Sequence, residues 1–560
     1  MFLAKVVIFR RVNCNFAGAY FNSILFKMRK LLFFLVLGLL PQIMLAQGSW
    51  SHHLRVDAAA VGAVGDQLPF WLHSGREGRW DFAEQQQLLG AVGGGLQWTP
   101  GEHWRLAVAG EGRYGGAEGG AYLHALSFQV DAYFLTLRAG RHVFDPIFEE
   151  GYKGHGSYLY GNNARPADRV TVGLPAYTAL PGFLRRLEVK GELSHALLDD
   201  GPADQYHREV LLHEKYAYLR YNGGSWKPYV GLNHSVLMGG YRTNGDKIPL
   251  DYWRSILGRS SEKIGGGDAT NAGGAHMGLF DFGVYLSKAS GTYRFYYQAP
   301  FADGSGMKLG VRNRDQILGL HWQPARLTWL DNLSVEWINT AYQSGNGMPD
   351  ARVTLNNGET ISVIAFYLDD PAYREELMRG LGAPNPESWS KKEVGRYLED
   401  NFNRGNRFGG RDGYMSNGMY PAGWTYYGRV MGSPLNLSRD QVAHLNPELG
   451  TNKSTLLVND RFKALHVGAD GRLGTRWYWE GMLTAARHYG SYFQQYPGRY
   501  TWDETPGYYF KGGRSQFYSR LGARYRSPRI QGLVWKLEVA VDAGALSRST
   551  GCLGGFSFSF

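Results

Sequence analysis

Cysteine is scarce in this sequence, since the 560 residues contain only Cys14 and Cys552. Cys14 lies in an N-terminal segment that we expect to be removed, which leaves a single thiol. A disulfide framework and a thiolate metal site are therefore both excluded, because each needs at least two cysteines. Export without disulfides is typical of a bacterial envelope protein whose stability has another source.

The sequence also has little charge and no series of long apolar runs. Charged residues make up 19% of the chain and the mean hydropathy is −0.34, whereas each helix of a membrane bundle needs about 20 consecutive apolar residues. Aromatic residues reach 14%, which excludes disorder over most of the length. A β-barrel that turns only every second residue to lipid is compatible with this composition.

Basic runs are absent beyond the N-terminus. The first 46 residues hold six basic side chains and no acidic one, and without them the formal charge of +11 falls to +5. These six residues are Lys5, Arg10, Arg11, Lys27, Arg29 and Lys30. The remaining chain has no Lys and Arg cluster long enough to follow a phosphate backbone, so we expect no nucleic-acid partner.

The N-terminal segment has the pattern of a secretory signal peptide. Met28-Arg29-Lys30 precedes the apolar stretch 31–40, and cleavage after Ala46 is plausible. We therefore predict a signal peptide over residues 1–46, with the true start at Met28, and an exported chain from residue 47 to 560. An uncleaved N-terminal anchor is the alternative.

Alternation of apolar and polar residues with period two recurs in segments of about ten residues, separated by Gly, Asn and Asp clusters, as in membrane barrels. In the segment 535–542, Trp535 and Val539 fall on one face, and Glu538 and Asp542 on the other. The same division occurs in 186–192, 293–298 and 520–526. We predict that one face meets lipid and the other water.

Two substitutions would test this prediction. Val539→Arg should impair insertion, because a lipid-facing cation costs about 2–4 kcal/mol near the middle of the membrane. Glu538→Gln should be mild. A soluble β-sandwich would alternate too, but its buried face prefers Val, Ile and Leu over the Trp, Tyr and Gly of this chain.

Two regions interrupt the strand pattern. Asp370-Pro371 opens a helical stretch, and Ser390 with Glu393 forms a capping-box sequence that opens a second one. We predict a helical loop insertion over about residues 369–408, and a short helix over residues 251–257. Long excursions of a barrel lie on its outer side, whereas periplasmic turns are short.

Motifs of catalysis and metal binding are missing. The sequence has no His-Glu-x-x-His, no cysteine pair and no Gly-x-Ser-x-Gly between a strand and a helix. We therefore expect a protein that is not an enzyme, with no metal and no cofactor. A Ser-His-acid site assembled from separate strands would leave no short motif, so an outer-membrane hydrolase stays open as an alternative.

Several unusual short sequence strings follow one another along the chain. They are Pro69-Phe70-Trp71-Leu72, Gly161-Asn162-Asn163-Ala164-Arg165-Pro166, Leu212-His213-Glu214-Lys215, Gly231-Leu232-Asn233-His234, Phe280-Asp281-Phe282-Gly283, Tyr296-Tyr297-Gln298-Ala299-Pro300-Phe301-Ala302-Asp303, Gln343-Ser344-Gly345 and Gly423-Trp424-Thr425-Tyr426-Tyr427-Gly428-Arg429. In this order they resemble the Wzi-like capsule assembly protein family. The resemblance covers about residues 50–435.

This resemblance implies an all-β fold, namely an antiparallel transmembrane β-barrel of about 18 strands in the outer membrane of a Gram-negative bacterium. It also implies a non-catalytic, lectin-like role in which the barrel binds capsular or exported polysaccharide at the cell surface and supports capsule assembly and attachment. The final strand ends at Phe560, as in barrels that present an aromatic terminus to the insertion machinery. An outer-membrane porin is the alternative, and it requires an open lumen.

Sugars combine hydroxyl rims with apolar ring faces, so candidate ligand residues are polar or planar. We single out Asn163, Arg165, His234, Trp253, Gln298 and Asp303. Each has an alternative structural role: Asn163 in turn geometry, Arg165 in an ion pair with a lumen carboxylate, and His234 in lumen hydrogen bonding. For Arg520 and Arg524 two roles are open: they attract an anionic polymer, or they balance carboxylates in the lumen.

Overall fold

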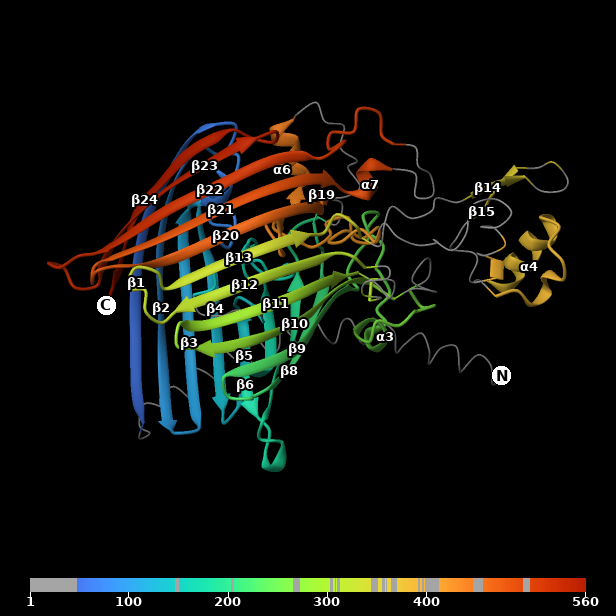
Figure 1. Cartoon of the computed structure of the whole chain (residues 1–560). Coiled ribbons are helices and arrows are strands. Elements are labelled where there is room, and N and C mark those ends of the chain that lie inside the picture. The colour runs from blue at the N-terminus through green and yellow to red at the C-terminus, as the bar shows by residue number, and fades with distance from the viewer. Residues whose placement is uncertain are drawn as a thin grey trace, which may run out of the picture.

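The computed structural model is a closed, antiparallel barrel of 18 strands (Figure 1). It describes residues 48–146, 151–202, 206–264, 272–302, 306–307, 309, 313–343, 351–354, 358, 360–363, 370–390, 393–394, 397, 412–446, 457–496 and 504–560. The predicted signal peptide and Asp303 lie outside these residues. The predicted fold class and strand number are confirmed.

The barrel consists of β1–β13 followed by β20–β24, each paired with its neighbours in chain order. Their bounds are β1 Ser49–Gly65, β2 Gln86–Gly101, β3 Trp104–Gly115, β4 Ala121–Ala132, β5 Leu135–Arg141, β6 Asp168–Ala179, β7 Leu187–Leu198, β8 Val210–Tyr221, β9 Trp226–Met238, β10 Ala275–Lys288, β11 Gly291–Phe301, β12 Gln316–Pro324, β13 Asn332–Asn339, β20 Arg461–Leu473, β21 Trp477–Gly490, β22 Arg514–Arg526, β23 Leu533–Gly544 and β24 Ser549–Ser559. The last strand closes on the first, with Val56 opposite Phe558. Closure leaves no open sheet edge to desolvate in lipid.

Other elements lie in the connections. They are α2 Phe70–His73, η1 Gly116–Glu118, η2 Gly182–Leu184, α3 Tyr252–Ile256, β14 Ala351–Thr354, β15 Thr360–Val363, α4 Pro371–Gly380, η5 Pro386–Ser388, β16 Thr425–Tyr426, β17 Arg429–Val430, β18 Leu437–Ser438, α6 Arg439–Leu445, β19 Leu457–Asn459 and α7 Tyr492–Gln495. No helix among the described residues is both long and apolar enough to cross a membrane.

The two ends of the barrel differ in their connections. Turns such as 102–103, 133–134 and 474–476 close one end, whereas the connection between β13 and β20 at the other end spans residues 340–460. We call these the short-turn end and the loop end. The strand β1 begins, and the chain ends, at the short-turn end. At the loop end, α3 packs against the outer side of β8 and β9, and α4 lies beyond the wall (Figure 1).

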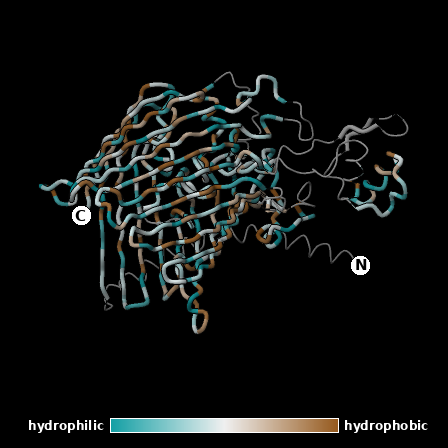
Figure 2. The backbone as a smooth tube through the Cα atoms, viewed as in Figure 1, coloured by the Kyte–Doolittle hydropathy of each residue, from teal (hydrophilic) through white to brown (hydrophobic). Residues whose placement is uncertain are grey.

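The strands present two chemically different faces. On β23, Trp535, Leu537, Val539 and Val541 are exposed, while Glu538 is buried inside the barrel. Figure 2 shows the same alternation of hydrophobic and hydrophilic positions around the wall. The predicted outward and inward faces of this strand are confirmed, and the outward side chains form an apolar surface suited to lipid.

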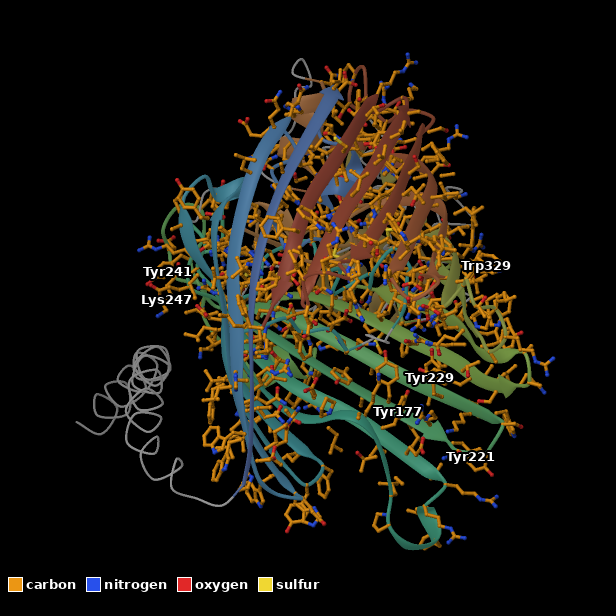
Figure 3. The ribbon with its side chains drawn as sticks, turned by 90° about the vertical axis from the view of Figure 1, so that its left-hand side faces the viewer. Tyr177, Tyr221, Tyr229, Tyr241, Lys247 and Trp329 are labelled. Carbon is orange, nitrogen blue, oxygen red and sulfur yellow. The ribbon has the colours of Figure 1, made fainter. Side chains whose placement is uncertain are left out.

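Aromatic side chains gather at the short-turn end. Trp50 stacks on Trp98 with ring centroids 5.9 Å apart, and Trp477 packs against Tyr525 at 4.6 Å. Figure 3 views this end, with Trp329 on the outer rim. Such rings stabilise a barrel at a membrane interface, where an amphipathic ring meets both lipid and water.

The lumen is filled by chain from the loop end. Segments around α2, around residues 151–165 and around β16–β17 bury Trp71, Tyr158 and Trp424 against the inner wall, where they pack with Tyr218 and Tyr518. These three segments together are the plug. Its chemistry is mostly aromatic, so the interior of the barrel has a packed core near the loop end rather than a water-filled channel.

A glycine lets the plug touch the wall. At Gly468 on β20, an added Cβ would lie 1.9 Å from the carbonyl oxygen of Lys153 in the plug. Beside this contact, His466 Nε2 lies 3.0 Å from the same oxygen. Any side chain at position 468 would push the plug from the wall.

Within the predicted insertion of residues 369–408, the described residues include α4 and a capping box at Ser390. Asp370 caps α4 by accepting a 2.9 Å hydrogen bond from the Ala372 amide, with Pro371 at the first helical position. Ser390 and Glu393 exchange the two bonds of a capping box, 2.7 and 3.3 Å long. Most of the chain after Glu393 up to residue 411 lies outside the described residues.

Candidate functional site

A short hairpin presents a tyrosine at the loop end of the barrel. Strands β16 and β17 pair through Tyr426 and Arg429, and the two turn residues have positive φ, 49° at Tyr427 and 68° at Gly428. Such a turn suits Gly at its second position but strains a tyrosine at its first. The strained residue stays 37% exposed, so the hairpin displays a ring to solvent.

Arg165 lies directly against this ring. Its guanidinium carbon is 4.0 Å from the Tyr427 ring centroid and 5.1 Å from that of Tyr122 on β4. Its Nη1 donates a 2.7 Å hydrogen bond to Glu118, so Arg165 forms an ion pair, but with a carboxylate of the β3–β4 connection and not with the lumen carboxylate that the alternative expected. We call Glu118, Tyr122, Arg165 and Tyr427 the rim cluster. It combines planar apolar faces with charged donors and acceptors.

The loop between β7 and β8 holds the hairpin in place. The Tyr427 amide donates a 2.5 Å hydrogen bond to Asp200, whose other carboxylate oxygen accepts from the His207 amide at 2.8 Å. Burial raises the pKa of Asp200 to about 6, and burial lowers the pKa of His207 to about 4. At neutral pH the carboxylate is therefore ionised and the imidazole neutral.

The predicted Asn163 has a structural place inside the plug. It is buried, and its Oδ1 accepts a 3.2 Å hydrogen bond from the Gly75 amide. The neighbouring Asn162 has a φ of 49° and accepts from the Glu77 amide at 2.7 Å. Together these bonds tie the segment of residues 151–165 to the segment around α2. The backbone turn expected for the Asn pair lies at Asn162, whereas Asn163 bridges two segments.

The other predicted residues are dispersed. Gln298 is buried in the lumen and donates to Asp281 at 3.0 Å. His234 lies on the outward face of β9, 3.0 Å from His276, so the lumen role expected for it is wrong: its neighbours Asn233 and Ser235 face inward instead. Trp253 on α3 is 72% exposed. Of the five predicted residues that the structure describes, only Arg165 therefore belongs to the rim cluster.

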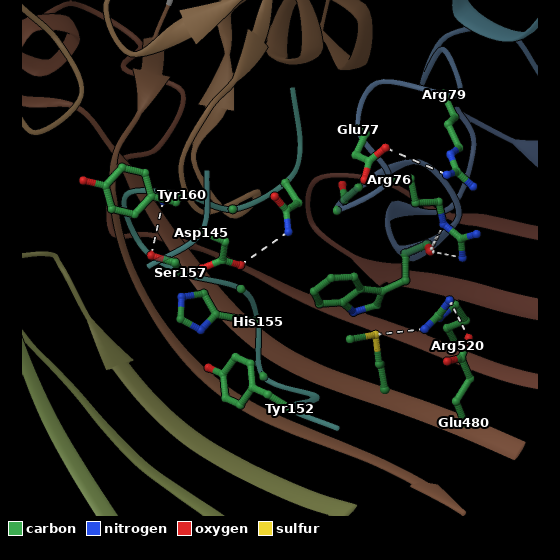
Figure 4. Close-up of a pocket in the computed structure, with 18 of the residues that line it drawn as sticks. Arg76, Glu77, Arg79, Asp145, Tyr152, His155, Ser157, Tyr160, Glu480 and Arg520 are labelled. Carbon is green, nitrogen blue, oxygen red and sulfur yellow. Dashed lines mark hydrogen bonds and ion pairs between the residues drawn. The ribbon is translucent and has the colours of Figure 1, made fainter. Parts of the chain in front are cut away.

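A cavity of about 370 Å³ lies between the plug and the wall. Plug and wall both line it, and Figure 4 shows Arg76, Asp145, Tyr152, Tyr160 and Arg520 around the space. Additional lining residues include Trp71, Arg79, His155, Glu480, Met482 and Lys536. We call this space the inner cavity.

Ion pairs lock the plug to the wall beside this cavity. Glu538 on β23 is fully buried and pairs with Arg76 of the plug, with Arg520 at 3.0 Å and with Lys536 at 2.6 Å. Arg520 also contacts Glu480 at 3.1 Å, as does Arg524. These arginines therefore balance lumen carboxylates, which decides between the two roles expected for them.

The inner cavity also contains an oriented imidazole. His155 Nδ1 lies 2.8 Å from Glu336, and the backbone amide of the same histidine donates to that carboxylate at 2.7 Å. His155 Nε2 is buried and has no hydrogen-bond partner in the described structure. No described serine hydroxyl thus completes a Ser-His-acid arrangement with His155. Across the described ranges, no cluster of three or more His, Cys, Asp or Glu side chains is arranged to hold a metal ion.

Solved structures of outer-membrane barrels share this architecture. Wzi of Escherichia coli, described as a carbohydrate-binding β-barrel of the outer membrane involved in group 1 capsule assembly, aligns over 90% of this chain and 84% of its own, with a TM-score of 0.50 and 13% identity. The chain is similar in fold to Wzi. Two barrels of Pseudomonas aeruginosa, OccK5 and OprD, align at TM-scores of 0.41 and 0.42 with 8% and 10% identity, over 91% and 92% of this chain and 98% of each of theirs.

The suspected resemblance to Wzi thus holds at the level of the fold. No protein-family model matches the chain, and no curated protein matches it. At 13% identity to Wzi, a role for any single residue has to be argued from the geometry of this chain.

Tyr427 and Trp71 lie in two of the unusual strings of the sequence, but neither was among the predicted ligand residues. The Tyr-Gly pair before Arg429 is a turn signal that could have indicated an exposed ring at position 427. The inner cavity has no comparable signal, because its walls come from strands and loops far apart in the sequence.

Proposed function

We propose that the protein is an outer-membrane barrel of a Gram-negative bacterium that binds capsular or exported polysaccharide at its outer surface and supports capsule assembly and attachment. The rim cluster carries this proposal. Long barrel connections face the cell exterior, so Tyr427 and Arg165 lie where an exported polymer passes. The likeness in fold to Wzi agrees with this role.

The chemistry of the rim cluster fits a sugar ring. The exposed face of Tyr427 offers an apolar plane for the C–H face of a pyranose, and Glu118 offers an acceptor for its hydroxyls. The Arg165 side chain is only 9% exposed and supports the Tyr427 ring by packing on it. The backbone of Tyr427 is already held by the hydrogen bond from its amide to Asp200 before any ligand binds. A preorganised site of this kind loses little conformational entropy on binding.

The filled lumen argues against the porin alternative. A diffusion pore requires continuous water, whereas Tyr158, Leu159 and Tyr414 are fully buried across the lumen. We expect no stepwise conductance from the purified barrel in a planar bilayer. Steady open-channel currents would favour a porin.

We also infer that the barrel acts without catalysis. The imidazole of His155 has no nucleophile bonded to Nε2 among the described side chains, although its Nδ1 is oriented by Glu336. Incubation with the purified polysaccharide, and with ester and lipid panels, should release no new reducing ends, acids or alcohols. Release that depends on His155 would establish a hydrolase instead.

Export and insertion belong to the same proposal. Residues 1–46 supply the signal peptide, and β24 supplies the terminal strand, with outward Phe556 and Phe560 exposed at its end. Deleting Phe560 should reduce the amount of barrel recovered in the outer membrane. An unchanged yield would argue against recognition of this strand by the insertion machinery.

The test uses a matched pair of tyrosines. Tyr427→Ala removes the exposed ring, and Tyr241→Ala removes a ring that stacks with Arg208 at 4.4 Å in another outer connection. In a deletion strain complemented with each variant, cell-bound and released polysaccharide are measured, and binding of the purified polymer is titrated. We expect Tyr427→Ala to weaken binding about tenfold, equivalent to ~1.4 kcal/mol, and to move polymer into the medium.

Tyr241→Ala should leave both quantities unchanged. Equal behaviour of the two variants would remove the rim cluster from the proposal. Unaltered polysaccharide in the deletion strain itself, with the wild-type protein in the outer membrane, would overturn the proposed function.

A further inference from the structure

The inner cavity is a second place where polar and apolar groups converge, separate from the rim cluster. Its lining includes the cations Arg76, Arg79, Arg520 and Lys536 and the anions Glu77, Asp145 and Glu480. A volume of about 370 Å³ is within the range of small-ligand sites. The space is therefore large enough to hold a compact molecule.

The charges of the cavity are already balanced by the protein. Arg76, Arg520 and Lys536 all pair with Glu538 behind the lining, and Arg79 lies 3.8 Å from Glu77. An anionic ligand would have to compete with these carboxylates. A neutral ligand rich in hydroxyl groups would not, because each hydroxyl both donates to a carboxylate and accepts from a guanidinium.

Apolar surface lies beside these charges. Trp71 and Met482 line the cavity together with Tyr152 and Tyr160. The Trp71 ring is fixed by a 3.2 Å hydrogen bond from Nε1 to Thr484 and by packing against His466 at 5.4 Å. Rigid aromatic surface next to paired donors and acceptors is the chemistry that recognises a sugar ring.

Solvent reaches this region from the short-turn end. Along the inner face of β22 and β23 toward that end, the exposed fraction of the side chain rises from 10% at Arg520 to 42% at Arg524, and from 0% at Glu538 to 32% at Lys536. Toward the loop end, Asp542 is buried beneath the plug and Gln516 beneath the β23–β24 connection. The wall residues that line the inner cavity thus become more exposed toward the short-turn end.

We propose that the inner cavity is a binding site for one neutral sugar unit that enters from the short-turn end. Met482 and Trp71 contact its ring, and the guanidinium and carboxylate groups around Arg520 and Glu480 bond its hydroxyls. The site does not depend on the rim cluster, because no residue belongs to both. The barrel then has a second saccharide site between plug and wall, in addition to the rim cluster.

The experiment uses the full exported chain purified in detergent and isothermal titration with D-glucose, D-galactose, D-mannose and N-acetylglucosamine, and with D-glucuronate as the anionic comparison. Met482→Phe fills the cavity from β21. Leu483→Phe enlarges the next residue on the same strand, which is 50% exposed on the lipid-facing side. Heat-modifiable migration on gels verifies that both variants fold.

We expect at least one neutral sugar to give saturable heat with wild type and Leu483→Phe, and none with Met482→Phe. Lys536→Gln, which removes one donor at the entrance, should weaken the same titration about fivefold, and it provides a second test if Met482→Phe does not fold. Tyr427→Ala should leave the titration unchanged, which separates this site from the rim cluster.

Four results would overturn the proposal. No saturable heat with any neutral sugar would show that the cavity does not bind the predicted class. Equal titrations of Met482→Phe and Leu483→Phe would place the binding elsewhere, as would loss of the heat in Tyr427→Ala. Saturation by glucuronate alone would make the cavity an anion site.

Discussion

Replacing Glu538 by glutamine should destabilise the barrel far more than its sequence context suggests. The carboxylate is fully buried and contacts Arg76 of the plug and Arg520 and Lys536 of the wall. Glutamine keeps the volume but removes the charge that compensates three cations. Breaking a buried ion pair from one side typically costs about 3–5 kcal/mol, because a charge is left buried without its partner.

The loss of stability in Glu538→Gln should fall toward the lower end of this range, about 3 kcal/mol. Arg520 retains Glu480 at 3.1 Å, and Arg76 Nη2 retains the carbonyl oxygen of Trp71 at 3.0 Å. Two of the three cations thus keep one acceptor. A loss of 3 kcal/mol corresponds to about two decades in the unfolding equilibrium constant.

Reversible guanidinium unfolding in lipid vesicles, followed by tryptophan fluorescence, measures this loss. The matched control is Asp331→Asn, which removes the carboxylate from an exposed pair with Arg472 at 2.9 Å and should cost less than about 1 kcal/mol. A Glu538→Gln midpoint that coincides with that of Asp331→Asn would refute the argument that this carboxylate locks the plug.

Further predictions concern the lipid face, the titration of a loop carboxylate and the capping of the outer helix. Val539→Arg should make the free energy of folding into vesicles less favourable by about 2–4 kcal/mol, because Val539 is 46% exposed on the lipid side. Equal insertion of the variant and wild type would contradict the assignment of Val539 to the lipid face. Burial raises the pKa of Asp460 to about 7 from an ordinary value near 3.8, so its contribution to stability is full below pH 3.8 and declines as the pH rises to 7. Asp460→Asn should therefore stabilise the barrel at pH 8 and change little at pH 4, in melting curves at both pH values. Ser390→Ala should increase proteolytic cleavage near residue 390 and leave barrel unfolding unchanged, since it removes only a helix cap worth about 1 kcal/mol.

Much of the wall was predictable because period two is a local property. The segment 535–542 assigns its own two faces, and β23 has these faces. Which face turns to lipid is harder to predict where both carry polar residues, as on β8 and β9. There α3 covers the outer wall, and Lys215 donates to the carbonyl oxygen of Ile256, so polar side chains are tolerated on the outward face and His234 was misplaced.

The plug was not predictable from pattern. Residues 151–165 mix glycine, tyrosine and histidine without a helical or strand period, and their positions depend on wall residues such as Glu336, Ser334 and Asp470. The same nonlocality explains why Glu538→Gln was expected to be mild. Arg165 was predicted as a sugar ligand from its residue type, which stays a prediction. Its contact with Tyr427 exists only after two plug segments have packed side by side.

The ion pair between Arg76 and Glu538 has a consequence for biogenesis. Its partners are 462 residues apart in the chain, one following the first strand and the other lying on the strand before the last. Such distant contacts form late, because the loop between them must first be closed. Sealing of the seam between β1 and β24 and ordering of the plug are therefore coupled steps. A chain that stalls before the seam closes leaves its plug segments open to proteolysis, so quality control can distinguish unfinished barrels from finished ones.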